Sequence, residues 1–313
     1  MSVKTGIEWT DSTWNPVRGC SRVSRGCENC YAERVAGRFS DEGFPFHGFA
    51  RRYAGSDRAE HARATEGRWT GKVELVEKHL EDPLRWKAPR RVFVNSMSDL
   101  FHEKLSIEDV ARVFSVMERC PQHTFQVLTK RAELMRGFAR LHKVLPNVWL
   151  GVSIEDQKTA DERIPLLLEA PAARRFVSAE PLLGPVELFR YLAPAYRAHW
   201  TRGYDPDVDD HAALAQLARA AMRRQFGDAP FLDWVIVGGE SGPGARPFAL
   251  SWARTVLAEC RAAGVPAFMK QVGSRPEGDF AELATMTGER LASSKGGDPS
   301  EWPEDLRVRE FPS

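Results

Sequence analysis

Seven short runs rich in β-branched and other apolar residues recur along the chain, and most are followed by a polar cluster and a helix-like pattern. The runs are GKVELVE (71–77), RVFVNSMSDLF (91–101), TFQVLTKR (124–131), NVWLGVSIED (147–156), RRFVSAEPLLGP (174–185), DWVIVGGESGPG (233–244) and PAFMKQVG (266–273). Apolar strands that alternate with helices are typical of a parallel sheet buried on both faces. With one more strand before the first cysteine, they predict an α/β fold, a complete or partial β/α barrel. A doubly wound sheet is the alternative, because sequence does not reveal strand order.

Polar residues stand at the carboxyl ends of these runs, the edge at which barrel enzymes place their active sites. They include Asn95, Ser96, Ser98, Asp99, Lys130, Ser153, Glu155, Glu180, Glu240 and Lys270. Serine and aspartate also begin helices, so helix caps or ion pairs explain about half of these positions equally well. Capping explains Lys130, Glu180, Glu240 and Lys270 less well.

The chain of 313 residues is predicted to form a single barrel domain, residues 1–313. Insertions interrupt the strand–helix rhythm near 37–70 and 190–230, and an extended tail is expected near 292–313. Either insertion serves as a lid over a pocket or as simple surface elaboration.

Charge is balanced, with 44 basic and 43 acidic side chains, so the total demands neither a membrane nor a nucleic-acid partner. No signal peptide and no run of about 18 apolar residues is present, and we expect a cytoplasmic protein. Local stretches still pair arginine with aromatic rings, at 85–91 around Trp86 and at Arg51, Arg52 and Tyr53. These stretches suit phosphate contact with base stacking, and they suit an ordinary solvated surface as well.

Three of the five cysteines, Cys20, Cys27 and Cys30, form a C-x6-C-x2-C pattern. Structural zinc sites need four ligands, so zinc would require a distant fourth one such as His47. A disulfide is a poor fit in a reducing compartment. Three thiolates can hold three irons of a [4Fe–4S] cluster and leave the fourth open to another molecule. Cys120 and Cys260 stand apart and are expected to be buried core residues.

The segment NPVRGCSRVSRGCENCYAER (15–34) resembles the cluster loop of radical S-adenosylmethionine enzymes, especially the spore photoproduct lyase-like branch, if three extra residues separate the first two cysteines. The segments SMSDLFH, LTKR, GVSIE, SAEPLLG and GGESGPGARP are similar to a phage- and prophage-encoded three-cysteine family of undefined function. This second resemblance covers almost the whole chain.

The resemblance implies that the three cysteines hold a [4Fe–4S] cluster and that S-adenosylmethionine is the second cofactor, with a separate electron donor. By their positions, the residues assigned to cofactor binding are Tyr31, Ser96, Ser98, Asp99, Lys130, Ser153 and Glu155. Glu180, Glu240 and Lys270 are assigned to the substrate, and no catalytic residue is assigned. The chain departs from the superfamily in two respects. Asn29 precedes the third cysteine, where the superfamily usually has an aromatic residue, and Tyr31 follows it; the Gly-Gly-Glu stands at 238–240 and not after the second strand.

Three functions are therefore open. The first is a radical S-adenosylmethionine enzyme that generates a 5′-deoxyadenosyl radical and acts on a nucleic acid, a nucleotide or another target. The second is an iron–sulfur protein that binds nucleic acid or a partner without turnover. The third is a zinc-binding module.

Overall fold

The computed structural model describes residues 5–53, 66–192, 231–278 and 291–312. Most of the predicted insertion at 190–230 and part of the one at 37–70 lie outside these residues. Within the described ranges, no helix has the length and apolar character needed to cross a membrane.

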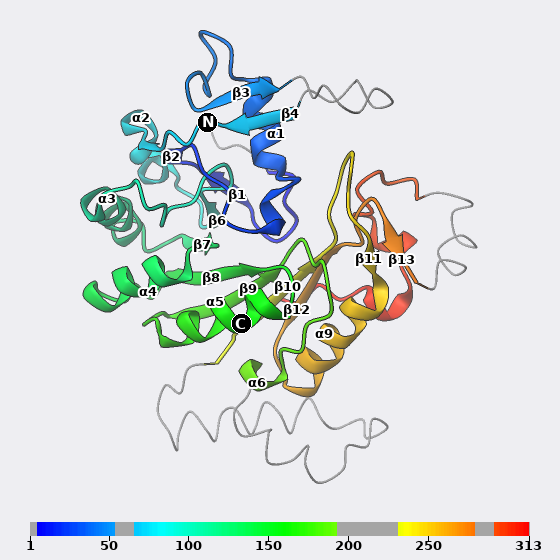
Figure 1. Ribbon diagram of the computed structural model, residues 1–313. Helices are drawn as coiled ribbons and strands as arrows, with labels where there is room; N and C mark the ends of the chain where they lie inside the picture. Colours follow the sequence, from blue (N-terminus) through cyan, green and yellow to red (C-terminus); the bar gives the residue numbers. More distant parts are fainter. Residues whose placement is uncertain (1–4, 54–65, 193–230, 279–290, 313) are drawn as a thin grey trace, which may run out of the picture. The chain divides into compact units, whose positions relative to one another are not determined.

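The main sheet is parallel, and its strands follow one another in chain order, β1-β6-β7-β8-β9-β10-β12 (Figure 1). The strands are β1 (Ser12–Trp14), β6 (Arg91–Val94), β7 (Thr124–Thr129), β8 (Val148–Ile154), β9 (Arg174–Ala179), β10 (Trp234–Gly238) and β12 (Ala267–Gln271). This order lacks the reversal that defines a doubly wound sheet. The predicted α/β fold is therefore confirmed, and its seven parallel strands are compatible with a partial barrel.

The prediction of a main-sheet strand at 71–77 is wrong. This run gives only the two-residue strand β5 (Glu74–Leu75), which pairs antiparallel with β2 (Val17–Arg18) outside the main sheet. Its exposed and half-buried residues are not those of a central strand. The strand expected before the first cysteine is present as β1, so the main sheet has seven described strands instead of the predicted eight.

The chain divides into two compact units, and the boundary falls within β8. The first unit contains residues 1–151 and 170–173, and the second contains 152–169 and 174–313.

In the first unit, α3 and α4 follow β6 and β7. Ser106 caps α3 by accepting the backbone N–H of Asp109 at 3.0 Å. An antiparallel hairpin of β3 and β4 packs on α1, and a Cβ on Gly37 of α1 would lie 2.3 Å from the Cα of Gly67 in β4. Only glycine permits this close approach. The other elements are η1 (Arg25–Cys27), α1 (Tyr31–Arg38), β3 (Ala50–Tyr53), β4 (Glu66–Trp69), α2 (Glu77–Leu80), η3 (Asp82–Arg85), α3 (Ile107–Glu118) and α4 (Ala132–Leu141).

In the second unit, the core forms around Trp234, whose ring lies 5.9 Å from Phe176 and 5.5 Å from Phe311. The tail runs along β12, where Met269 N–H donates to Val308 at 2.8 Å, so the chain end closes this core. The other elements are α5 (Gln157–Glu169), α6 (Phe189–Leu192), β11 (Phe248–Ala249), α9 (Leu250–Ala262), β13 (Pro276–Glu277), η4 (Pro299–Glu301) and η5 (Glu304–Leu306).

Candidate functional site at the cysteine loop

The three clustered cysteines lie on one loop between β2 and α1. Cys20 follows β2 after Gly19, Cys27 ends η1, and Cys30 is the N-cap residue of α1. All three thiols are free and partly exposed, whereas Cys120 and Cys260 are fully buried, as predicted. Gly19 has a φ of 87°, and a Cβ at this position would lie 1.9 Å from the Lys72 carbonyl oxygen. Glycine is thus required to bring the backbone past Lys72 and into the loop.

Burial raises the pKa of the Cys20 thiol to about 12, and the charge of Asp99 adds to the rise while that of Arg131 opposes it. Burial also raises the pKa of Cys30, against the opposing effect of the backbone N–H groups of Glu33 and Ala32. At neutral pH both groups are therefore protonated, and a metal ion that bound them would have to displace the protons.

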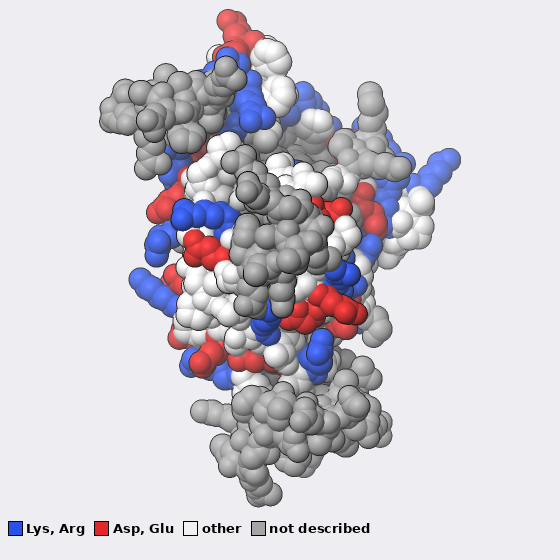
Figure 2. All heavy atoms as spheres, turned by 90° about the vertical axis from the view of Figure 1, so that its right-hand side faces the viewer, with Lys and Arg blue, Asp and Glu red and all other residues white. Residues whose placement is uncertain are grey.

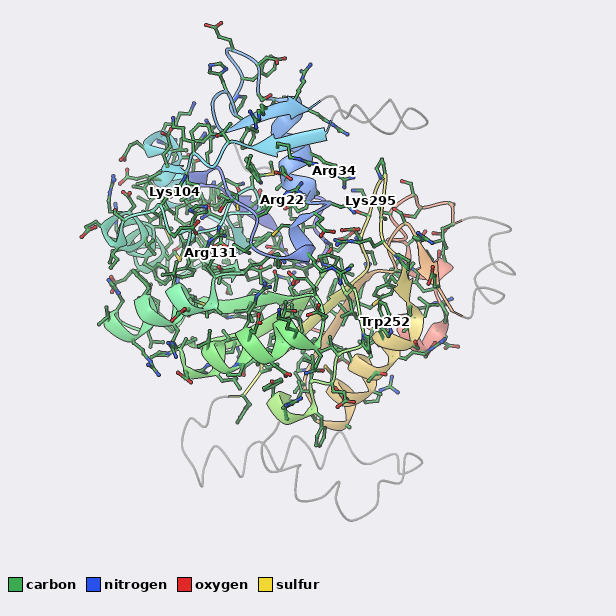
Figure 3. All side chains as sticks on the ribbon, in the orientation of Figure 1. Arg22, Arg34, Lys104, Arg131, Trp252 and Lys295 are labelled. Carbon is green, nitrogen blue, oxygen red and sulfur yellow. The ribbon has the colours of Figure 1, made fainter. Side chains whose placement is uncertain are left out.

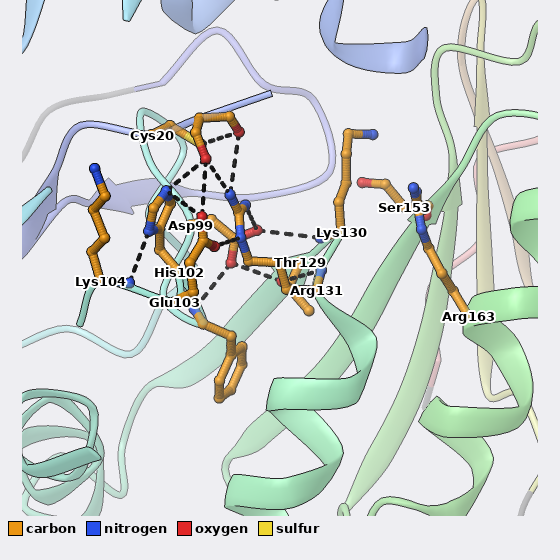
Figure 4. Close-up of polar contacts among 12 residues, drawn as sticks. Cys20, Asp99, His102, Glu103, Lys104, Thr129, Lys130, Arg131, Ser153 and Arg163 are labelled. Carbon is orange, nitrogen blue, oxygen red and sulfur yellow. Dashed lines mark hydrogen bonds and ion pairs between the residues drawn. The ribbon is translucent and has the colours of Figure 1, made fainter. Parts of the chain in front are cut away.

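Arg131 is the centre of a charged network beside this loop (Figure 4). Its guanidinium donates to Asp99 at 3.0 Å, to Glu103 at 2.6 Å and to the Ser21 hydroxyl at 2.8 Å. Arg131 precedes α4, Asp99 and Glu103 follow β6, and Ser21 adjoins Cys20. Arg131 and Asp99 are 8% and 5% exposed, so the ion pair is shielded from water and fixes the loop against the sheet edge.

His102 holds the same loop from another side. Its Nδ1 accepts the backbone N–H of Lys104 at 3.1 Å, so the ring proton sits on Nε2, which donates to the Ser21 hydroxyl at 2.9 Å. Ser21 in turn donates to Glu103 at 3.3 Å. Burial and the charge of Arg131 lower the pKa of His102, which keeps this ring neutral at pH 7.

An open hollow of about 330 Å³ lies beside Cys20. Its wall includes Arg22 and Arg68, which both contact the buried Glu33 carboxylate, with Arg22 at 2.5 Å. Glu33 also accepts the backbone N–H of Trp69 at 2.9 Å, so it joins α1 to β4. The hollow gives solvent and small molecules a route to the Cys20 side of the loop.

The predicted cofactor residues of the first unit gather at this loop. Tyr31 donates its hydroxyl to the Ser96 carbonyl at 2.5 Å, and the Ser98 hydroxyl donates to the Val17 carbonyl at 2.9 Å. Asp99 accepts the Thr129 hydroxyl at 2.7 Å and the backbone N–H of Lys130 at 3.3 Å. Four of these residues, Tyr31, Ser96, Ser98 and Asp99, thus make hydrogen bonds that order the loop and the strand ends.

The predicted residues of the second unit make pairs of their own. Arg163 donates to the Ser153 carbonyl at 2.8 Å and to the Glu155 carboxylate at 3.1 Å. Lys270 pairs with Glu180. Glu240 accepts from Arg246 at 2.7 Å. Because Glu240 is bound in this way, the Gly-Gly-Glu at 238–240 has a structural partner within its own loop.

Asn95 stands among the strand-end residues without a role assigned from sequence, and the structure singles it out. It is 3% exposed and has a φ of 61°, and its Oδ1 accepts the backbone N–H of Val17 at 3.3 Å. Its Nδ2 has no hydrogen-bond partner in the described part of the chain. A buried amide donor without a partner costs free energy, which makes Asn95 a candidate for a role beyond packing. Sequence reasoning also misses Ser21, His102, Glu103 and Arg131. Of these, His102 and Arg131 carry a sequence signal, because they lie in the segments SMSDLFH and LTKR, and Arg131 also ends a strand run beside Lys130.

The donor set fits an iron–sulfur cluster in its chemistry, because three soft sulfur ligands lie on one loop and influence one another's charge. Among the described residues, no group of three or more His, Cys, Asp or Glu side chains has a metal-holding arrangement.

One solved structure, a spore photoproduct lyase complexed with a dinucleoside spore photoproduct, is similar at 11% identity with a TM-score of 0.34. The match covers 84% of this chain and 63% of that one. No curated protein sequence matches. Residues 4–297 match the family described as "Protein of unknown function (DUF5131)", and the chain belongs to this family.

Proposed function

We propose that this protein is a radical S-adenosylmethionine enzyme whose Cys20, Cys27 and Cys30 hold a [4Fe–4S] cluster. The observation that carries the proposal is the set of three free, partly exposed thiols on one loop, which leaves a fourth iron without a protein ligand. Cys20, Cys27 and Cys30 would hold the cluster, which in its reduced form would supply one electron to S-adenosylmethionine, giving methionine and a 5′-deoxyadenosyl radical that takes a hydrogen atom from a substrate. A nucleic acid or nucleotide is the proposed substrate class.

The residues of the chain hold the cysteine loop in place and contact the cofactors. Cys20 is kept in place through Ser21, which Arg131 and His102 hold from two sides. Asn95 contributes a buried N–H donor next to Val17, which suits a carboxylate or a sulfur acceptor. In the first unit, Tyr31, Ser96, Ser98 and Asp99 act by ordering the loop, and Lys130 stays a predicted contact of the cofactor.

The residues of the second unit keep the roles that their sequence positions predict. Ser153 and Glu155 are proposed for cofactor binding. Glu180, Glu240 and Lys270 are proposed for the substrate, which they would meet as paired charges.

Anaerobic reconstitution tests this proposal. Wild-type protein is expected to bind iron and sulfide, turn brown and, after reduction with dithionite, release 5′-deoxyadenosine from S-adenosylmethionine. Substitution of Cys20, Cys27 and Cys30 by serine removes the soft ligands and is expected to abolish all three signals.

The matched control is the Cys120→Ala/Cys260→Ala variant, which removes the two buried thiols and is expected to retain the cluster. A brown protein that releases no 5′-deoxyadenosine would favour the iron–sulfur binding protein. A colourless protein that purifies with one zinc ion would favour the zinc module.

A further inference from the structure

Large apolar side chains, three of them aromatic, are exposed on α1 and in the segments on either side of it. Eight such residues are prominently exposed, and four of them lie between positions 23 and 44. They are Val23, Tyr31, Phe39 and Phe44, with exposures of 45%, 46%, 44% and 49%. Exposed aromatic rings that gather in one segment mark an interaction surface, whereas single exposed apolar residues need no explanation.

The same segment is rich in arginine. Residues 15–53 contain seven arginines and four acidic residues, although the whole chain has a formal charge of only +1. Two of the four acids are paired, Glu33 with Arg22 and Asp41 with Arg52, and the arginines still outnumber the acids by three. Arg22 and Arg34 lie along the α1 side of this region (Figure 3). The surface of this segment is therefore positive against a nearly neutral background.

We call the exposed rings and arginines of α1, of the loop that follows it and of β3 the aromatic–arginine face, and we define it by Tyr31, Phe39, Phe44, Arg38 and Arg51. The rings of Phe39 and Phe44 lie 6.0 Å apart. Arg52 of β3 donates to the Arg38 carbonyl at the end of α1 at 3.1 Å, which ties the hairpin to the helix. In the space-filling view, acidic, basic and uncharged side chains all lie at the upper end, the height at which Figure 1 places the hairpin (Figure 2).

The other basic stretch, residues 85–91, has a different construction. Arg90 lies 5.1 Å over the Trp86 ring, and His123 lies 5.8 Å from the same ring. Arg91 is paired with Asp11 at 3.2 Å. Neighbours within the protein thus already contact the tryptophan ring, which leaves it poorly suited to stack on a base. This stretch leads into the amino end of β6. The cysteine loop lies at the carboxyl ends of the neighbouring strands, so the two basic regions are separate.

We propose that the aromatic–arginine face binds single-stranded nucleic acid. Arginines that contact phosphates and exposed rings that stack on bases are the two elements by which proteins bind single strands without sequence preference. Duplex DNA hides the faces of its bases, so the rings would add nothing to duplex binding. The face begins at Tyr31, the neighbour of Cys30, so a bound strand would pass beside the cysteine loop. That the bound strand is the substrate rests on the proposed function. That this face binds single-stranded nucleic acid does not.

The test measures binding of a fluorescent single-stranded oligodeoxynucleotide to the full-length protein, with and without reconstituted cluster. Phe39→Ala/Phe44→Ala is expected to weaken binding by about fivefold or more per ring, since each stacked base is worth about 1–3 kcal/mol. Phe39→Tyr/Phe44→Tyr keeps the rings and is expected to keep the affinity. The matched control, Leu134→Ala/Leu141→Ala, removes two exposed apolar side chains from α4 and is expected to change nothing.

Charge is tested separately. Arg38→Gln/Arg51→Gln is expected to weaken binding and to flatten the dependence of log affinity on log salt by about 0.7 for each phosphate that the variant no longer neutralises. Arg85→Gln/Lys87→Gln removes as much charge from the other basic stretch and is expected to leave the slope unchanged.

Several outcomes would overturn the inference. These are unchanged binding by the phenylalanine-to-alanine variant, equal losses from both charge variants, tighter binding of duplex than of single strand, or binding of an acidic peptide in place of the oligonucleotide. Because the measurement includes cluster-free protein, loss of binding would leave the proposed cluster chemistry untouched. Equally, failure to assemble a cluster would leave binding unchanged.

Discussion

The carboxyl ends of the strands carry charge in different ways in the two units. In the first unit, the buried Arg131 draws Asp99, Glu103 and Ser21 into one network that reaches the cysteine loop. In the second unit, Glu180 pairs with Lys270 and Glu240 pairs with Arg246. The network of the first unit fixes the cysteine loop to the strand ends through one shared cation, whereas each pair of the second unit joins side chains that a ligand can recruit without dismantling the fold.

The largest expected effect comes from removing the hub of the first unit. Arg131→Met leaves the Asp99 carboxylate buried without its cation, and loss of one partner from a buried ion pair costs about 3–5 kcal/mol. Urea denaturation of cluster-free protein measures this change in the free energy of unfolding. Arg131→Lys, which keeps the charge but not the forked geometry of the guanidinium, is expected to fall between wild type and Arg131→Met.

A smaller effect is expected in the second unit. Lys270→Met breaks the Glu180 pair, whose side chains are 17% and 19% exposed, so water can solvate the carboxylate that remains. We expect a loss of about 1–2 kcal/mol by the same denaturation measurement. A loss as large as that of Arg131→Met would show that the two units hold their charges equally tightly and would remove the contrast between them.

The smallest expected effect is in the pH dependence of stability, which should have opposite signs for one carboxyl group of each unit. Burial raises the pKa of Glu103, but the hydrogen bond and the positive charge of Arg131 lower it to about 2. Burial raises the pKa of Glu259, on α9 of the second unit, to about 7, although its carboxylate accepts the Leu188 N–H at 2.6 Å. Relative to the ordinary value of 4.5, the two carboxyls therefore shift in opposite directions.

Stability should follow these directions. Glu103 contributes stability above pH 4.5 that is lost as the pH falls toward 2, whereas Glu259 favours folding at low pH and loses that contribution as the pH rises from 4.5 to 7. The difference in unfolding free energy between wild type and Glu103→Gln should thus rise with pH in the lower window. The difference between wild type and Glu259→Gln should fall with pH in the upper one, and equal slopes would contradict the assignment. The Glu103 effect will be modest because its side chain is 53% exposed.

Much of the fold was predictable because strand and helix patterns are local. The runs that became β6 to β10 and β12 are continuous apolar segments, which need no distant partner to be recognised. The run at 71–77 was wrongly predicted as a strand of the main sheet because its sequence resembles the other apolar runs. Only the structure shows that it pairs antiparallel with β2, outside the main sheet. The cysteine loop was predictable from spacing alone, since all three thiols fall within eleven residues.

The sequence by itself determined the parallel α/β fold and the presence of three thiols on one short loop, because both follow from patterns of residues that are close together in the chain. Tertiary structure decided what surrounds that loop. Arg131 lies 110 residues from Ser21 and 32 from Asp99, so no local pattern links them. Such partners meet only when parallel strands bring their carboxyl ends to one edge, and burial then makes each charge depend on the others.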